Sequence, residues 1–398
     1  MADERSGRQM NLHEYQAKAL LRKFGAAIPD GENATSPDGA ADAARRLGGD
    51  VWVVKAQIHA GARAQAGGVR MVSSPEKAAA AARDLLGKHI VTAQTGPEGI
   101  AVKSVYVEKA CDVEREIYAA IIVHRAKASV VVLVGRESGT GVERTLARRE
   151  TLFELPFGPD GADQAGIEAM AAFLSIDQDQ ARKVADMLTQ ARRAFIELDA
   201  RLIELNPLAL TKTGDVMALD AKMIIDDNAM WRHPELEELR DKDETHPLER
   251  AADQFEINYA RMDGNIGILT MGAGLGLATM DMIIDEGGHP ANFMDVRPMA
   301  TRDQVAEGIK LLINDNRVKV ILVMAVGGGL LHCDTIAEGL GHVFGKTGAA
   351  KPVVYYAVGT GKEISELTLK NQGIPVAITD SMEEAVEEAV RIAGSGSA

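Results

Sequence analysis

The chain has 398 residues, more than one hydrophobic core usually supports, so we expect two or three domains. Its net charge of −14 argues against general binding to nucleic acid or to an anionic membrane, because phosphate affinity requires clustered Lys and Arg. The only cysteines, Cys111 and Cys333, lie far apart in no CxxC pattern, which predicts neither a disulfide framework nor a zinc site. The 39 glycines and the low aromatic content of 4% favour an α/β architecture with many tight turns.

The N-terminal segment, residues 1–9, contains acidic residues and lacks the apolar core of a signal peptide. We interpret it as a disordered extension, with the fold beginning near Met10. No run of about 18 apolar residues occurs, so no membrane span is expected. Together these features predict a cytoplasmic protein.

The first half of the chain alternates between Ala-rich helices and short strands. Residues 11–24 carry Leu12, Tyr15, Ala19, Leu20 and Phe24 at helical spacing, and Gly25 ends the pattern. The further expected elements are a helix over 37–47, strands over 51–55, 101–108, 116–124 and 129–134, a helical stretch over 165–198 and a hairpin over 201–224.

The second half of the chain begins after a charged stretch, 228–250, which we interpret as a linker with a domain boundary near residue 245. Beyond it, strands alternate with Gly turns and helices, and the strands are expected over 265–271, 291–296, 319–326, 352–357 and 374–378. Such βα units predict a parallel, doubly wound sheet.

The hairpin carries a candidate metal site. If its turn is centred on Thr213, Asn206 faces Asp220 and Glu204 faces Lys222, on the side opposite to the apolar residues. An amide oxygen beside a carboxylate suits Mg²⁺, and Glu204 is placed to contact a cationic or phosphorylated group above it. The alternative, a solvated polar face of an edge hairpin, stays open from this geometry alone.

A candidate phosphate loop, residues 57–68, follows the strand that ends at Lys55. Its small residues would let backbone N–H groups approach phosphate, with Lys55 and Arg63 as counter-charges. It lacks the Walker A order, and a flexible surface loop is the alternative. Glu108 and Glu116, taken alone, are more typical of surface charges.

These segments together resemble the β subunits of succinyl-CoA synthetases. The resemblance covers about residues 10–390 and rests on MNLHEYQAK at 10–18, the loop at 55–68, the segment 107–116, ELNP at 204–207, GNIG at 264–267, GGHPANF at 287–293 and Cys333-Asp334, in the family's order and spacing. The sequence of residues 57–63 is also similar to that of malate–CoA ligase β subunits.

The resemblance implies an ATP-grasp domain over 10–245, with a lid subdomain over about 25–105, followed by a flavodoxin-like CoA-ligase domain over 246–398. It implies Mg²⁺, ATP or ADP, a small carboxylic acid, and a partner α subunit that binds CoA and carries a phosphohistidine. By the same resemblance Glu204 would steady the phosphohistidine, Asn206 and Asp220 would hold Mg²⁺, and the nucleotide would contact Lys55, Ala62, Arg63, Ala64, Glu108, Cys111 (through its main chain) and Glu116.

The implied reaction is an ADP-forming acid–CoA ligation that requires the α subunit. ATP phosphorylates the α-subunit histidine, the phosphate passes to the acid, and the CoA thiolate attacks the acyl phosphate to give acyl-CoA and phosphate. The protein's task is mainly placement and charge stabilisation.

The chain departs from the family pattern in the acid-facing loops of the second domain. Met271 stands where the family has an Asn that contacts the acid, and Met offers no such hydrogen bond. A Gly run is replaced around Arg297, and the family's Gly-Gly-Ile-Val-Arg loop becomes longer. The residues expected to face the acid are therefore Met271, Arg297, Gly328, Gly329, Leu330 and His332.

Three alternatives follow from these departures and from one rival motif. The acid is malate or another acid, with Arg297 or His332 supplying replacement anion contacts, or the chain is a catalytically weak, nucleotide-binding regulatory subunit. The run at 272–276 also imitates a dinucleotide fingerprint, but Leu277 occupies the position of the third glycine.

Overall fold

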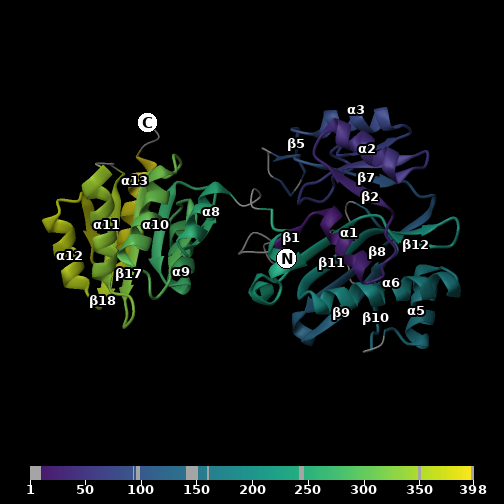
Figure 1. Cartoon of the computed structure of the whole chain (residues 1–398). Coiled ribbons are helices and arrows are strands. Elements are labelled where there is room, and N and C mark those ends of the chain that lie inside the picture. The colour runs from purple at the N-terminus through teal and green to yellow at the C-terminus, as the bar shows by residue number, and fades with distance from the viewer. Residues whose placement is uncertain are drawn as a thin grey trace. The chain divides into compact units, whose positions relative to one another are not determined.

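The computed structural model describes residues 10–92, 94–95, 99–139, 151–158, 161–241, 246–347 and 351–395. The chain divides into two compact units, with the boundary between Arg240 and Asp241, which Figure 1 colours from purple to teal and from green to yellow. The predicted extension over residues 1–9 lies outside the described residues. Among the described helices, none combines the length and the apolar character needed to cross a membrane.

The larger sheet of the first unit is antiparallel, with the order β1-β13-β11-β8-β9-β10 and with β12 beside β11. Its strands are β1 (Met10–Leu12), β8 (Val113–His124), β9 (Ser129–Gly135), β10 (Leu152–Leu155), β11 (Ala200–Thr211), β12 (Val216–Ala218) and β13 (Ala221–Ile225). Helices α1 (Glu14–Lys23), α5 (Gln164–Leu174) and α6 (Gln178–Glu197) pack on it and bury its apolar face.

A smaller antiparallel sheet in the same unit has the order β2-β7-β3-β4. Its strands are β2 (Gly31–Ala34), β3 (Trp52–Ala56), β4 (Val69–Val72) and β7 (Val105–Lys109), and a short ribbon joins β5 (His89–Ile90) to β6 (Ile100–Ala101). Helices α2 (Pro37–Leu47) and α3 (Pro75–Leu85) cover one face (Figure 1), and their buried alanines allow close packing. Ser36 and Ser74 cap them, each followed by Pro at the first helical position.

Two expected helices of the first unit differ from the prediction. Helix α1 begins at Glu14 rather than near residue 11, because residues 10–12 form strand β1 against β13. Its buried face includes Glu14 and Lys18, whereas Ala19 is exposed. The helical stretch 165–198 is two helices, because Ser175 ends α5 with a φ of 56° and Asp177 caps α6.

The expected linker over 228–250 is shorter than predicted. Residues 227–237 form a 3-10 turn, η3 (Asp227–Arg232), and helix α7 (Pro234–Glu237), and Leu236 is buried in the core of the first unit. Met230 and Leu239 pack against the same core, but a few scattered apolar residues in a charged segment are a weak sequence signal, which is why the pattern suggested a linker. Another 3-10 turn, η1 (Arg125–Lys127), connects β8 to β9.

The second unit is a doubly wound sheet with the order β14-β16-β15-β17-β18-β19. Its elements are α8 (Pro247–Gln254), β14 (Asn258–Arg261), β15 (Ile266–Met271), α9 (Ala273–Asp285), β16 (Asn292–Val296), α10 (Arg302–Asn314), β17 (Val320–Gly327), α11 (Cys333–Thr347), β18 (Val353–Gly359), α12 (Lys362–Asn371), β19 (Val376–Thr379) and α13 (Met382–Gly394). Strand β14 is antiparallel to β16, and the other pairings are parallel.

Taken in chain order, strands β15 to β19 have the spatial order 2-1-3-4-5, which is the flavodoxin-like arrangement. Helices α9 and α13 pack against one core of this unit, and α10, α11 and α12 pack against the other, so both faces of the parallel sheet are covered. The predicted α/β fold class is thereby confirmed.

Gly264 provides a test of the packing in the second unit. A Cβ at this position would lie 2.1 Å from the carbonyl oxygen of His289 and 2.2 Å from that of Pro290, so the backbone would have to move. We predict that Gly264→Ala destabilises the protein by about 1–3 kcal/mol, measured by urea unfolding followed by circular dichroism. Gly345→Ala in α11 is the control, since nothing lies within 4 Å of its Cβ and Ala favours a helix. Equal losses in both variants would contradict this account.

Candidate functional site

The hairpin has the predicted register. Glu204 pairs with Lys222, and the backbone N–H of Asn206 donates to the carbonyl oxygen of Asp220 at 3.3 Å. On the opposite side Ile203 and Leu205 are fully buried in the core, as period-two alternation requires. The amide and the carboxylate of the candidate metal site therefore lie on one face, and the predicted pairing is confirmed.

The side chain of Asn206 is oriented by two neighbours. Its Nδ2 donates to Oε1 of Glu204 at 3.2 Å, and its Oδ1 accepts from the N–H of Gly139 at 2.7 Å. Next to Gly139, the hydroxyl of Ser138 donates to Oε2 of Glu116 at 2.9 Å. Glu116 lies on β8, opposite Ala209 of the hairpin, and the segment after β9 contacts both Glu116 and Asn206.

The carboxylate of Asp220 is held by Arg63. The guanidinium donates to both carboxylate oxygens at 2.8 and 2.7 Å, and it also contacts the carbonyl oxygen of Ala56 at 2.9 Å and Oε2 of Glu14 at 2.8 Å. Arg63 is 8% exposed, whereas the Asp220 side chain is 38% exposed. Both bonds to Asp220 come from Nη2, which also contacts Glu14, whereas Nη1 donates to Ala56, so one guanidinium links the loop to the hairpin and to α1.

The loop over 57–68 is anchored rather than free. The Arg63 side chain is buried and anchors the loop, and the N–H of Gly68 donates to the carbonyl oxygen of Arg63 at 2.7 Å. Ala62 has a φ of 61°, and Ala64 is exposed. Arg63 therefore faces carboxylates instead of the outer side of the loop.

The ammonium groups of Lys55 and Lys18 contact the same acceptors next to the hairpin. The Lys55 ammonium contacts Glu14 Oε1 at 2.9 Å, Glu108 Oε2 at 2.5 Å and the Leu219 carbonyl oxygen at 2.5 Å. The Lys18 ammonium contacts the same Glu14 oxygen at 2.9 Å, the Leu219 carbonyl oxygen at 2.6 Å and the other oxygen of Glu108. These groups and their neighbours form what we call the ion cluster: Glu14, Lys18, Lys55, Arg63, Glu108 and Asp220.

The formal charges of the ion cluster cancel, and the pKa shifts follow from burial and proximity. Burial by itself would raise the pKa of Glu14, but Lys18, Lys55 and Arg63 hold it well below its usual range. Burial opposes the charge on Lys55, yet its carboxylate partners raise its pKa. For Lys18 burial prevails, and its pKa is lowered.

Cys111 lies in the electrostatic surroundings of the ion cluster. Its pKa is raised first by burial and then by Glu108, so the thiol form is favoured. A reactive thiolate is thus not favoured here, which is compatible with a contact through the main chain.

His13 and His59 stack beside the ion cluster, with ring centroids 4.1 Å apart. Burial, reinforced by His13, Arg63 and Lys222, lowers the pKa of His59 to about 2. The ring is therefore neutral in the folded protein at physiological pH.

In the second unit the expected acid-facing residues lie at the carboxyl ends of neighbouring parallel strands. Met271 ends β15, Arg297 follows β16, and residues 328–332 follow β17. Ligands of doubly wound sheets bind at this edge, where the strand order reverses between β15 and β17. The topology therefore gathers the predicted residues along one edge.

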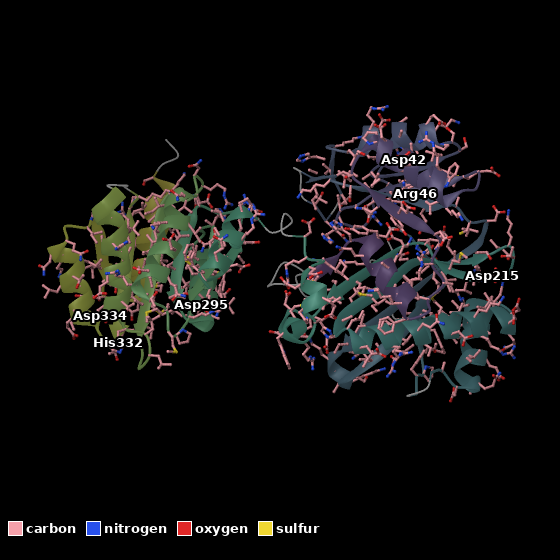
Figure 2. All side chains as sticks on the ribbon, viewed as in Figure 1. Asp42, Arg46, Asp215, Asp295, His332 and Asp334 are labelled. Atoms are coloured by element: carbon pink, nitrogen blue, oxygen red, sulfur yellow. The ribbon has the colours of Figure 1, made fainter. Side chains whose placement is uncertain are left out.

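The basic side chains at this edge already have carboxylate neighbours. Arg297 lies 3.6 Å from Glu256, and His332 lies 3.8 Å from Asp334 (Figure 2). In the loop that carries the other expected residues, the N–H of Gly328 donates to Leu331 at 2.9 Å; Gly329 and Leu330 are exposed. The sequence had no signal for the pairing of Arg297, because Glu256 comes from another loop, whereas Asp334 stands only two residues after His332.

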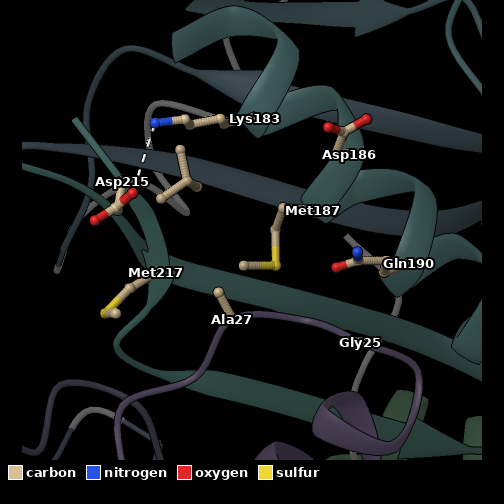
Figure 3. A pocket seen from close by; sticks show the side chains of 9 residues that line it. Gly25, Ala27, Lys183, Asp186, Met187, Gln190, Asp215 and Met217 are labelled. Atoms are coloured by element: carbon tan, nitrogen blue, oxygen red, sulfur yellow. Dashed lines mark ion pairs between the residues drawn. The ribbon is translucent and has the colours of Figure 1, made fainter. Parts of the chain in front are cut away.

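A hollow of about 270 Å³ lies elsewhere in the first unit (Figure 3). Lys183, Asp186 and Gln190 of α6 line it together with residues 215–217, and Lys183 lies 3.5 Å from Asp215. None of the predicted site residues is among those that line it, so the hollow is separate from the candidate site.

Sequence reasoning missed several groups that the structure places at the site. Glu14 and Lys18 stand four residues apart in a helix otherwise assigned by its apolar side chains, and this spacing was the available signal. Ser138 and Gly139 carried none, since their contacts to Glu116 and to the hairpin are purely tertiary.

Family models match both halves of the chain: an ATP-grasp domain over residues 11–210 and a CoA-ligase over residues 269–391. The chain is 40% identical over 392 residues to the β subunit of succinate–CoA ligase [ADP-forming] from Acidiphilium cryptum, covering 96% of this chain and 98% of that protein. It is 39% identical over 385 residues to the subunit of the same name from Staphylococcus aureus, covering 96% and 99%.

The fold is similar to a solved ATP citrate lyase from Methanothrix soehngenii in complex with citrate and coenzyme A. The TM-score is 0.70, at 16% identity, and the match covers 96% of this chain and 100% of that chain. At this identity the likeness supports the fold alone.

The shifted pKa of His59 predicts an acid sensitivity of the fold. Because the pKa is about 2 when folded against an ordinary value of 6.5, this group contributes stability above pH 6.5 that is lost as the pH falls. Between pH 6.5 and about 5 the loss is about 1.5–2 kcal/mol, and we expect His59→Gln to lack it. Urea unfolding at several pH values measures this. The exposed His89→Gln is the control, and an unchanged pH slope in His59→Gln would refute the assignment.

Proposed function

Because the chain belongs to the family of β subunits of ADP-forming succinate–CoA ligases, we propose that it is the nucleotide-binding subunit of an acid–CoA ligase. In this proposal ATP, succinate and CoA give succinyl-CoA, ADP and phosphate through a histidine of a partner α subunit. The observation that carries the proposal is the polar face of the hairpin, where Asn206 and Asp220 lie side by side next to a buried lysine pair.

The nucleotide would lie along the outer side of the ion cluster. Lys55 is the cation proposed to meet the phosphates, and the backbone of residues 62–64 is proposed to approach them. Glu108, Cys111 (through its main chain) and Glu116 are the further proposed contacts. In the structure Lys55 forms ion pairs with Glu14 and Glu108. It would have to exchange these carboxylates for phosphate when a nucleotide binds.

The donor set of the hairpin fits Mg²⁺. An amide oxygen and a carboxylate are hard ligands, and Mg²⁺ accepts few protein ligands because phosphates and water complete its shell. When bound, the ion would neutralise phosphate charge during phosphoryl transfer. Asp220 would then exchange Arg63 for the metal, and Arg63 would keep Glu14 and the Ala56 carbonyl as partners.

Glu204 is proposed to steady the phosphohistidine of the partner. Its contact with Nδ2 of Asn206 holds it at the same end of the polar face as the proposed metal ligands. The chemistry asked of this chain is placement and electrostatic stabilisation, and a fixed carboxylate next to an imidazole serves both.

The acid is proposed to bind at the carboxyl edge of the second unit. The names of the relatives support succinate and do not favour malate or another acid. Arg297 and His332 already face Glu256 and Asp334, which weakens their proposed role as replacement anion contacts. Met271 at the end of β15 remains the feature that favours a changed acid as second candidate.

The proposed function also implies two domains and a partner subunit. The ATP-grasp part would span residues 10–245, with its lid over about 25–105, and the CoA-ligase part would span 246–398. The chain would act in the cytoplasm with an α subunit that supplies most of the CoA site. A regulatory subunit that only binds nucleotide is the remaining alternative.

Co-expression with the α subunit of the same source tests the function. We expect ADP release that depends on CoA and on succinate, at rates ordinary for such ligases, measured in a coupled assay with malate and short organic acids as comparisons. Turnover with another acid but not with succinate would establish the second candidate. Nucleotide binding without turnover of any acid would leave the regulatory alternative.

Asp220→Asn tests the proposed metal ligand. Loss of its charge should reduce ATP-dependent phosphorylation of the α subunit by roughly 100-fold or more and raise the Mg²⁺ concentration required. Phosphohistidine formation with labelled ATP, titrated with Mg²⁺, measures both effects. The control is Asp215→Asn at the exposed end of the same hairpin, which lies outside the proposed site. Unchanged Mg²⁺ dependence in Asp220→Asn would exclude the assignment.

A further inference from the structure

Lys18 and Lys55 share the same three acceptors. Both ammonium groups contact Oε1 of Glu14 at 2.9 Å, both donate to the carbonyl oxygen of Leu219, and each binds one oxygen of the Glu108 carboxylate. The two cations thus hold equivalent positions, one anchored on helix α1 and the other on strand β3.

The second cation is costly to bury. Lys18 is 1% exposed, and its pKa is lowered first by burial and also by Lys55, while the Tyr106 ring, 5.5 Å from its ammonium, offsets part of this cost. Buried charges of this kind usually stabilise a fold no better than well-packed apolar side chains do. A role in folding stability alone therefore explains Lys18 poorly.

The acceptors themselves require a replacement cation when Lys55 turns to another anion. If Lys55 moved to a phosphate without Lys18, Glu14 and Glu108 would face one another and the phosphate with Arg63 as the remaining cation of the cluster. Like charges a few ångströms apart in a buried site repel strongly. With Lys18 in place, both carboxylates keep a partner throughout.

We propose that Lys18 is a positioning residue that retains Glu14, Glu108 and the Leu219 carbonyl when Lys55 transfers to nucleotide phosphate. This inference rests on the proposed nucleotide site and adds to it a residue outside the expected contacts. Lys18 is suited to this role because helix α1 holds its side chain in a buried position, where its ammonium contacts the same acceptors as that of Lys55.

A double-mutant cycle tests this role in the complex with the α subunit. The variants are Lys18→Met, Glu14→Gln and the combination of both, and Lys23→Met on the exposed side of the same helix is the control. Mg²⁺–ADP binding is measured by calorimetry, and folding is checked by circular dichroism. Replacing Lys18 alone leaves an uncompensated carboxylate, whereas the combination restores the charge balance.

We expect Lys18→Met to weaken Mg²⁺–ADP binding at least tenfold, and the combined variant to bind within threefold of Glu14→Gln. A merely structural role would instead give equal losses on both backgrounds, and this result, or unchanged binding in Lys18→Met, would overturn the inference. If Lys18→Met does not fold, the comparison of the combined variant with Glu14→Gln decides by the same threefold limit. Failure of the unmodified complex to bind Mg²⁺–ADP would instead overturn the proposed function, and the inference with it.

Discussion

A network of three cations and three carboxylates, buried except for the partly exposed Asp220, links the elements of the first unit at its candidate site. Lys55 and Glu108 come from the smaller sheet, Glu14 and Lys18 from α1, and Asp220 from the hairpin, with Arg63 between them. In a weakly polarisable interior each of these charges is tolerable only because an opposite charge touches it. Any ligand that binds one member must therefore leave the rest of the network balanced, and this constraint shapes the proposed chemistry.

The hairpin links this constraint to the proposed metal site. Both carboxylate oxygens of Asp220 accept from Nη2 of Arg63, and the Asn206 side chain is held by a backbone N–H and by Glu204. Both side chains are thus preorganised on one face, with partners that can be exchanged. In the proposed exchange Arg63 would retain Glu14 and a carbonyl on giving up Asp220, just as the carboxylates would retain Lys18 when Lys55 leaves. The network would then redistribute its contacts without creating an unpaired buried charge.

In the second unit the candidate residues lie at the carboxyl edge of a parallel sheet. A parallel sheet covered on both faces leaves its carboxyl edge as the place where loops from several strands meet. Met271, Arg297 and the loop after β17 converge there because β15, β16 and β17 are neighbours in the sheet. Arg297 and His332 each have a carboxylate neighbour, so the presence of a basic residue in these loops does not show that its side chain is available to a substrate.

The sequence by itself determined the α/β class, most elements of both units and the pairing of Asn206 with Asp220, because these depend on local periodicity and turn chemistry. It also carried the family motifs. Only the tertiary structure decided that residues 10–12 form a strand, that Leu236 anchors the charged segment after residue 227, and that Arg63 faces Asp220. The same holds for Glu14 and Lys18, whose importance arises from contacts with residues more than 40 positions away. Contacts of this range are set by how the sheets and helices pack, and no local pattern encodes them.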